Sequence, residues 1–206
     1  ASNTLSISNA VVEKTQKVIA QFIQSRATQL IASQPNLTGF LSGSNTGAMN
    51  LAVTRGRGDF DFASAPGADN GIWARLTGSW THEDTRNTRY TFGVIGSHVK
   101  LSPNLLIGGM IEFDFLSQED GASRIDGHGW LIGPYFVASS PAHPLFFEGM
   151  LLYGQTKNDI SPFGTYSDRF ETQRLLAQFK VTGEIDRGRT IWVPSVQLSY
   201  TSDTQR

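Results

Sequence analysis

Two carboxylates stand two residues apart near the middle of the chain, Glu112 and Asp114. Side chains at i and i+2 of a strand point to the same face, and two neighbouring carboxylates are able to act as general acid and general base. The favoured interpretation is nevertheless structural: both acids face the interior of the fold and pair with Arg75, Arg89 or Arg174.

The other reactive residue types form no recognisable site. The sequence has no cysteine, no G-x-S-x-G motif, no P-loop and no dinucleotide-binding motif. Its four histidines lack the spacing of metal ligands: His82, His98, His128 and His143. We therefore expect no catalytic residue, no cofactor and no metal site, and the sequence does not predict an enzyme.

The composition of the chain argues against several further classes of protein. The chain has 206 residues with 17 Lys+Arg against 18 Asp+Glu, and a net charge of −1 argues against a nucleic-acid partner. Hydrophobic residues make up 39%, yet no run reaches the ~18 apolar residues of a transmembrane helix. Only 17% of residues are charged, and the 21 glycines and 13 phenylalanines are unusual for a soluble enzyme.

One amphipathic helix is expected, from about Ala10 to Ala32. Its apolar residues recur with the helical period: Val11, Val12, Val18, Ile19, Phe22, Ile23, Ala27, Leu30 and Ile31. At 1.5 Å per residue such a helix is roughly 30 Å long, which is about the thickness of the bilayer core. Its polar face fits either a helix packed on a sheet, the favoured interpretation from the helix alone, or a helix inside a water-filled pore.

The chain is expected to divide into a helical region at 1–37, a Gly/Ser-rich connector at 38–70 and a β-domain at 71–206. The connector is expected to hold one weak strand, at Asn50–Thr54 or Asp59–Ala63. Within it, Arg57-Gly58-Asp59 is a tripeptide that integrins bind, but an exposed glycine-rich turn is the favoured interpretation.

The β-domain contains seven alternating segments. They are Ile72–Thr81, Arg89–Val99, Leu105–Phe115, Gly127–Ala138, Leu145–Gln155, Phe170–Ile185 and Thr190–Thr201. In the third, Ile111 and Phe113 oppose Glu112 and Asp114, and most of the others alternate similarly. The two segments from Gly127 to Gln155 alternate less clearly. These lengths and this period of two suit transmembrane strands of ~9–11 residues, but a soluble barrel shows the same alternation with its faces exchanged.

Loops and aromatic residues favour the membrane interpretation. Short turns at 102–104, 139–144 and 186–189 alternate with longer polar loops at 82–88, 116–126 and 156–169, as in outer-membrane barrels. Aromatic residues fall near the segment ends, as in the two aromatic girdles of such barrels: Trp73 and Trp192 at the short turns, and Trp80, Tyr90, Phe115, Trp130, Tyr153 and Tyr200 at the longer loops.

With these features, the chain resembles the C-terminal autotransporter β-domain, the type V secretion translocator of Gram-negative outer membranes. The matching stretches are Gln21–Ala27 and Gln34–Leu37 in the helical region, then Ile72–Leu76, Gly127–Tyr135, Pro144–Gly149, Leu152–Gly154 and Ser167–Thr172 with Arg174. The resemblance implies an all-β membrane barrel, antiparallel and up-and-down, of about 12 strands. It also implies an N-terminal α-helix in the lumen.

The resemblance further implies partners and a location. The partners are outer-membrane lipid, the chain's own passenger domain and the barrel-assembly machinery, and the location is the cell outer membrane of a Gram-negative bacterium. Seven strands fall short of 12, so the β-domain is expected to be C-terminally incomplete. Alternatively, Asn50–Ala63 supplies an eighth strand and the barrel is smaller and closed.

In this arrangement the helix plugs the pore through charged contacts with the lumen wall. The expected participants are Lys14, Lys17 and Arg26 of the helix with Arg75, Glu112, Asp114, Arg174, Lys180 and Glu184 of the wall. Some members of the family cleave their own helix at an asparagine activated by lumen acids. Here the combination to test is Asn9 with Glu112, Asp114 or Glu148, and cleavage is not the favoured expectation.

Two other functions remain open from the sequence. One is a soluble β-barrel module that binds an apolar ligand, and the other is a surface adhesin that acts through its exterior loops.

Overall fold

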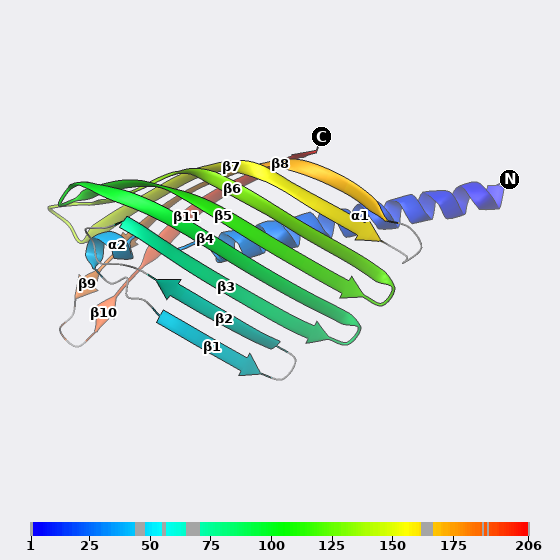
Figure 1. Ribbon diagram of the computed structural model, residues 1–206, viewed down its shortest axis with the longest axis horizontal. Helices are drawn as coiled ribbons and strands as arrows, with labels where there is room; N and C mark the ends of the chain where they lie inside the picture. Colours follow the sequence, from blue (N-terminus) through cyan, green and yellow to red (C-terminus); the bar gives the residue numbers. More distant parts are fainter. Residues whose placement is uncertain are drawn as a thin grey trace.

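A single curved antiparallel sheet forms most of the molecule (Figure 1). The computed structural model describes residues 2–43, 48–54, 57–64, 71–161, 167–186, 188 and 190–205. The nine strands of this sheet are β1 (Ala48–Thr54), β2 (Arg57–Ser64), β3 (Gly71–Glu83), β4 (Arg86–Ser102), β5 (Leu105–Asp120), β6 (Ser123–Ser139), β7 (Leu145–Ser161), β8 (Asp168–Gly183) and β11 (Ser195–Gln205). Each strand pairs with its neighbour along the chain, except that β8 pairs with β11 across a small hairpin of β9 (Ile185–Asp186) and β10 (Ile191–Trp192).

The nine strands exceed the expected seven or eight because the connector at 38–70 folds into a hairpin. Strands β1 and β2 pair with each other, and β2 continues the sheet by pairing with β3. The tripeptide Arg57-Gly58-Asp59 opens β2 and is therefore part of a ladder, not the exposed turn that the sequence suggested. Within the described residues, β1 and β11 do not pair with each other, so this sheet is open at both edges.

Two of the three longer loops prove to be strand. The loops expected at 82–88 and 116–126 shrink to two-residue turns at 84–85 and 121–122, and β4 and β5 lengthen to 17 and 16 residues. Asp84 (φ 51°) and Gly121 (φ 59°) take the left-handed conformation that tight hairpin turns require. The segment expected at Thr190–Thr201 is interrupted before Ser195, where Pro194 lacks the N–H that a ladder needs.

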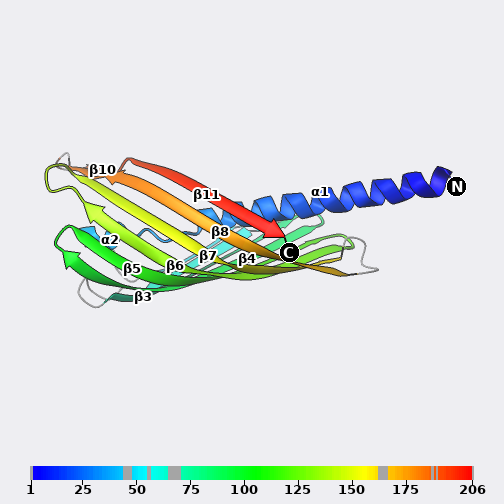
Figure 2. The same cartoon turned by 90° about the horizontal axis from the view of Figure 1, so that it is seen from above.

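The helix α1 (Ser2–Ala32) lies along the concave side of the sheet (Figures 1 and 2). It begins eight residues earlier than expected, and its N-terminal end projects past the end of the sheet that carries the β3–β4 and β5–β6 turns. A short second helix, α2 (Gly39–Ser42), covers the opposite end. Among the helical residues that the structure describes, no stretch is long and apolar enough to cross a membrane.

The two faces of the sheet differ sharply in chemistry. The convex face exposes large apolar side chains, which include Ile95, Ile107, Ile111, Phe113, Phe115, Trp130, Ile132, Phe136, Leu151, Tyr153 and Phe179. The concave face, against α1, mixes buried apolar residues with buried polar ones: Glu112, Asp114, Glu148, Thr156, Asn158, Thr172, Arg174, Gln178 and Thr182. The structure thereby assigns the faces of β6 and β7, which the sequence left undecided.

Two of the expected girdle aromatics face the other way. Trp73 and Tyr90 are each only 3% exposed and point to the concave side, whereas Trp80, Phe115 and Trp130 stand on the convex face as expected. Aromatic residues near strand ends therefore indicate the ends of strands but not their outward face.

Candidate functional site

The contact between α1 and the concave face is centred on Arg26. Phe22, Arg26 and Leu30 follow one another at four-residue spacing, which places them on one side of the helix, and each is at most 2% exposed. Arg26 Nε donates to Asp114 Oδ2 at 2.5 Å, and Arg26 Nη1 donates to Asn158 Oδ1 at 2.7 Å. The guanidinium thus bridges β5 and β7, with β6 between them.

A chain of hydrogen bonds continues from Asn158 through the wall. Asn158 Nδ2 donates to Thr156 Oγ1 at 3.2 Å, and Thr156 shares a 2.7 Å hydrogen bond with Thr172 on β8. The Thr172 hydroxyl donates to Asp203 on β11, and Arg174 binds the same carboxylate through two contacts of 2.8 and 2.9 Å. Arg174 therefore pairs within the wall, whereas the sequence analysis placed it against the helix.

The segment that follows α1 is held by a second set of contacts. We call residues 33–40 the anchor segment. Glu148 accepts hydrogen bonds from the backbone N–H and the hydroxyl of Thr38 at 2.7 and 2.8 Å, and it also forms an ion pair with Lys180 at 3.3 Å. Gln34 donates to Glu112 at 3.1 Å, and Lys180 donates to Asn36 at 3.3 Å.

An aromatic cluster holds the C-terminal end of the anchor segment. Phe40 of α2 packs against Trp73 and His98, with ring centroids 5.1 and 4.8 Å apart. The Tyr135 hydroxyl links the other two rings, because it accepts from Trp73 Nε1 at 2.8 Å and lies 2.9 Å from His98 Nδ1. Trp73 was expected in a membrane girdle, but its ring instead packs against Phe40 of α2.

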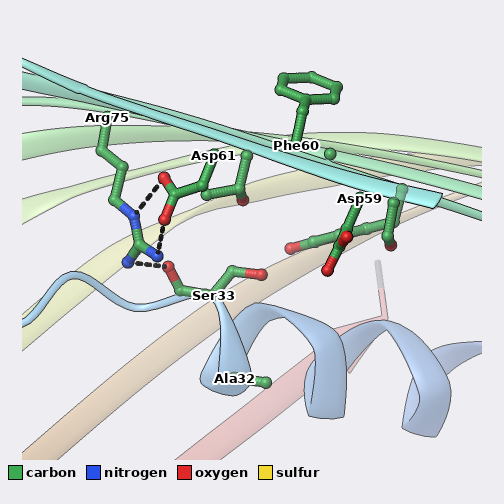
Figure 3. A pocket seen from close by; sticks show the side chains of 10 residues that line it. Ala32, Ser33, Asp59, Phe60, Asp61 and Arg75 are labelled. Atoms are coloured by element: carbon green, nitrogen blue, oxygen red, sulfur yellow. Dashed lines mark hydrogen bonds and ion pairs between the residues drawn. The ribbon is translucent and has the colours of Figure 1, made fainter. Parts of the chain in front are cut away.

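A cavity of about 280 Å³ separates the end of α1 from β2, β3 and β4 (Figure 3). Arg75 crosses it: the guanidinium binds Asp61 through two hydrogen bonds of 3.1 and 2.9 Å and also donates to the carbonyl oxygens of Ser33 and Gln34. A cation is favourable there because carbonyls at a helix C-terminus carry partial negative charge. The ring of Phe60 points to the opposite side of β2, whereas Asp59 and Asp61 point toward the cavity, so the lining combines charged groups with apolar surface.

Among the remaining predicted residues whose side chains the structure describes, Lys17, Glu184 and Arg89 take no part in these side-chain contacts. Lys17 is exposed, and the side chains of Lys14 and Asn9 lie outside the described part of the structure. Glu184 is half-buried and contributes its backbone N–H to Pro144. Arg89 is exposed on β4 and pairs with neither Glu112 nor Asp114.

Several residues that matter here gave no sequence signal. Thr38, Phe40 and Asn158 belong to common residue types without motif spacing, and only the fold brings them to α1. Asp61 was recognisable from the sequence as a residue on the polar face of a strand, because Asp59 and Asp61 alternate with Phe60 and Phe62.

The arrangement favours holding a helix over catalysing a reaction. Glu112 and Asp114 have different partners, Gln34 and Arg26, and no hydrogen bond joins the two carboxyl groups to each other. Within the part of the chain that the structure describes, no three His, Cys, Asp or Glu side chains come close enough to hold a metal ion.

Replacing Glu148 by Gln should loosen the anchor segment. The neutral amide retains one acceptor for Thr38 but loses the charge that Lys180 pairs with, and hydrogen bonds to charged groups contribute about 1.5–3 kcal/mol. We expect a fall in unfolding free energy within that range, measured by urea titration in detergent micelles. Glu171→Gln, in an exposed pair with Lys157, is the control and should change it much less; equal losses would contradict the assignment.

Comparison with known proteins yields one match. The family model described as the autotransporter beta-domain matches residues 72–205, which is most of the chain and spans β3 to β11. Neither the curated proteins nor the solved structures contain a significant match. Members of this family are type V secretion translocators of the Gram-negative outer membrane and not enzymes. A meander of long strands, with an apolar convex face and a concave face of mixed polar and apolar residues against a helix, agrees with that match, and the chain belongs to the autotransporter β-domain family.

Proposed function

We propose that this chain is the outer-membrane translocator of an autotransporter, which conducts or anchors an N-terminal passenger domain at the cell surface, with α1 plugging the pore. The observation that carries the proposal is the burial of Arg26 against Asp114 and Asn158, on a concave face that carries buried polar groups, whereas the other face of the sheet exposes large apolar side chains. The function needs no cofactor and no catalytic residue.

The two faces support a barrel with lipid outside and water inside. A transmembrane barrel turns alternate side chains to lipid and to the lumen, which matches the exposed Ile111 and Phe113 beside the buried Glu112 and Asp114. A soluble barrel that binds an apolar ligand needs the opposite arrangement. Open strand edges are not viable in lipid, so we expect the edges of β1 and β11 to be joined through further strands into the barrel of about 12 that the family resemblance implies.

The direction of α1 supports export to the cell surface. The helix enters from the end of the sheet where β3 meets β4 and β5 meets β6, and the chain continues from its C-terminal end to α2 at the opposite end of the sheet (Figure 1). If the end at α2 faces the periplasm, the N-terminus of α1 lies outside the cell, where a passenger would emerge.

Removal of the helix tests the plug. In the closed barrel, a variant lacking residues 1–33 and refolded into planar bilayers should show a higher single-channel conductance than the same barrel with these residues, because the lumen loses Phe22, Arg26 and Leu30. The control removes only residues 1–12, which leaves these three side chains in place and should keep the conductance near its original value. An unchanged conductance after the longer deletion would contradict the proposal.

A further inference from the structure

The geometry points to a guanidinium-binding site built into the lumen wall, which Arg26 occupies and which fixes the depth of α1. We call it the arginine socket and define it by Asp114, Gly127, Gly129 and Asn158. The inference rests on the proposed function only in placing the socket inside a pore.

Strand register brings the socket together on three neighbouring strands. Asp114 on β5 is paired directly with Gly129 on β6, and Gly127 on β6 is paired directly with Asn158 on β7. A carboxylate therefore stands on one side of β6 and an amide on the other, with two glycines between them. Because Gly127 and Gly129 have no side chains, the concave surface of β6 forms a trough here, and the guanidinium of Arg26 lies across it.

The trough fits the guanidinium closely. A Cβ atom added to Gly127 would lie 2.9 Å from Arg26 Nη1 and 2.6 Å from Asn158 Oδ1, and one added to Gly129 would lie 2.7 Å from Arg26 Nη2. These separations are well below ordinary van der Waals contact, and the guanidinium is not free to move aside because Asp114 and Asn158 hold it. Glycine is thus required at both positions by the space that Arg26 and its neighbours occupy, which include Phe22 beside Gly127 and the Gln155 carbonyl beside Gly129.

The Asn158 side of the socket is held independently of α1. The Asn158 amide nitrogen is committed to Thr156, so its Oδ1 atom is turned toward the helix as an acceptor. Thr156 is in turn fixed by Thr172, and Thr172 by Asp203. All these partners belong to the sheet, so the acceptor side of the socket is formed before a ligand arrives.

A guanidinium suits this socket better than an ammonium group. It is planar and presents donors in several fixed directions, which lets one group reach Asp114 from Nε and Asn158 from Nη1. An ammonium is a compact and strongly hydrated point charge whose donors do not span two acceptors on opposite sides of a trough. The socket therefore selects arginine at position 26.

The test is chemical rescue of Arg26→Ala in the full chain. Guanidinium chloride at millimolar, non-denaturing concentrations should raise the thermal unfolding midpoint of this variant in a saturable manner, and it should increase the yield of folded protein on refolding. Methylammonium chloride and sodium chloride at equal ionic strength should do neither. The wild-type chain, whose socket is filled, should not respond.

Two further variants locate the rescue in the socket. Arg26→Ala with Asp114→Asn should lose the response because the charge is gone, and Arg26→Ala with Gly129→Val should lose it because the trough is filled. The inference is wrong if guanidinium acts on Arg26→Ala no differently from methylammonium, in both midpoint and refolding yield. That result would leave the plug itself untouched, since helix deletion reports on the plug separately.

Discussion

Replacing Arg26 alone by Leu should lower the free energy of unfolding by about 3–5 kcal/mol, because it leaves Asp114 buried without its cation. Asp114→Leu alone should cost a similar amount for the converse reason. The double replacement should cost far less than the sum of the two, because a buried pair exchanged for apolar side chains leaves no charge uncompensated. The three variants form a double-mutant cycle, measured by urea unfolding in lipid vesicles.

The exposed pair of Lys157 and Glu171 is the matched control. The two residues pair on neighbouring strands at 3.1 Å but are 51% and 48% exposed, and exposed ion pairs contribute about 0–1 kcal/mol. If the Arg26 and Asp114 replacements prove simply additive, then the helix is not held by this pair, and its position depends on the anchor segment alone.

Replacing Ile132 by Arg should destabilise the folded protein in bilayers by about 2–4 kcal/mol, as found for a basic residue at the lipid-facing midplane of a barrel. Ile132 lies near the middle of β6 on the convex face, where it is 48% exposed. In a soluble protein, a side chain this exposed would tolerate arginine with little change. The measurement is therefore an unfolding titration in vesicles. The size of the loss in unfolding free energy distinguishes a lipid-facing convex surface from a water-facing one.

The control for Ile132 lies on the same face, near the end of the strands. Ser117 on β5 is four residues from the β5–β6 turn region, and Ser117→Arg should cost about 0–1 kcal/mol because the penalty falls toward the interface. Equal and small effects at both positions would count against a membrane-embedded convex face and favour the soluble alternative.

The expected strands were largely recoverable because each one is long and obeys a period of two. All seven predicted segments overlap strands of the structure, and the alternation of Ile111 and Phe113 with Glu112 and Asp114 is confirmed by their burial. Their ends were not recoverable, because polar residues at 82–88 and 116–126 look like loop in sequence but pair as strand in the sheet. The connector was underestimated for a similar reason, since a short β1–β2 hairpin gains most of its stability by pairing with β3.

The participants of the helix contact were only partly predictable. Arg26 and Asp114 stood out as charges on an amphipathic helix and on the polar face of a strand, and the structure places them together. Arg174 was expected to contact the helix in the same way, but it forms an ion pair with Asp203 instead. The register of β8 and β11 places these two residues directly opposite each other. Thr38, Phe40 and Asn158 carried no distinguishing pattern, because their roles depend on which strands become neighbours.

By itself, the sequence determined that strands alternate between an apolar and a polar face, because side-chain direction along a strand has a period of two whatever surrounds it. It did not determine which face turns inward, because exchanging lipid and water leaves that period unchanged. Only the tertiary structure decided this, by curving the sheet around α1 so that Glu112, Asp114 and Asn158 close on Arg26 and the apolar face is left outside. The physical reason is that a buried charge needs a partner at hydrogen-bond distance, and strands of different sequence position supply it only after their register is set.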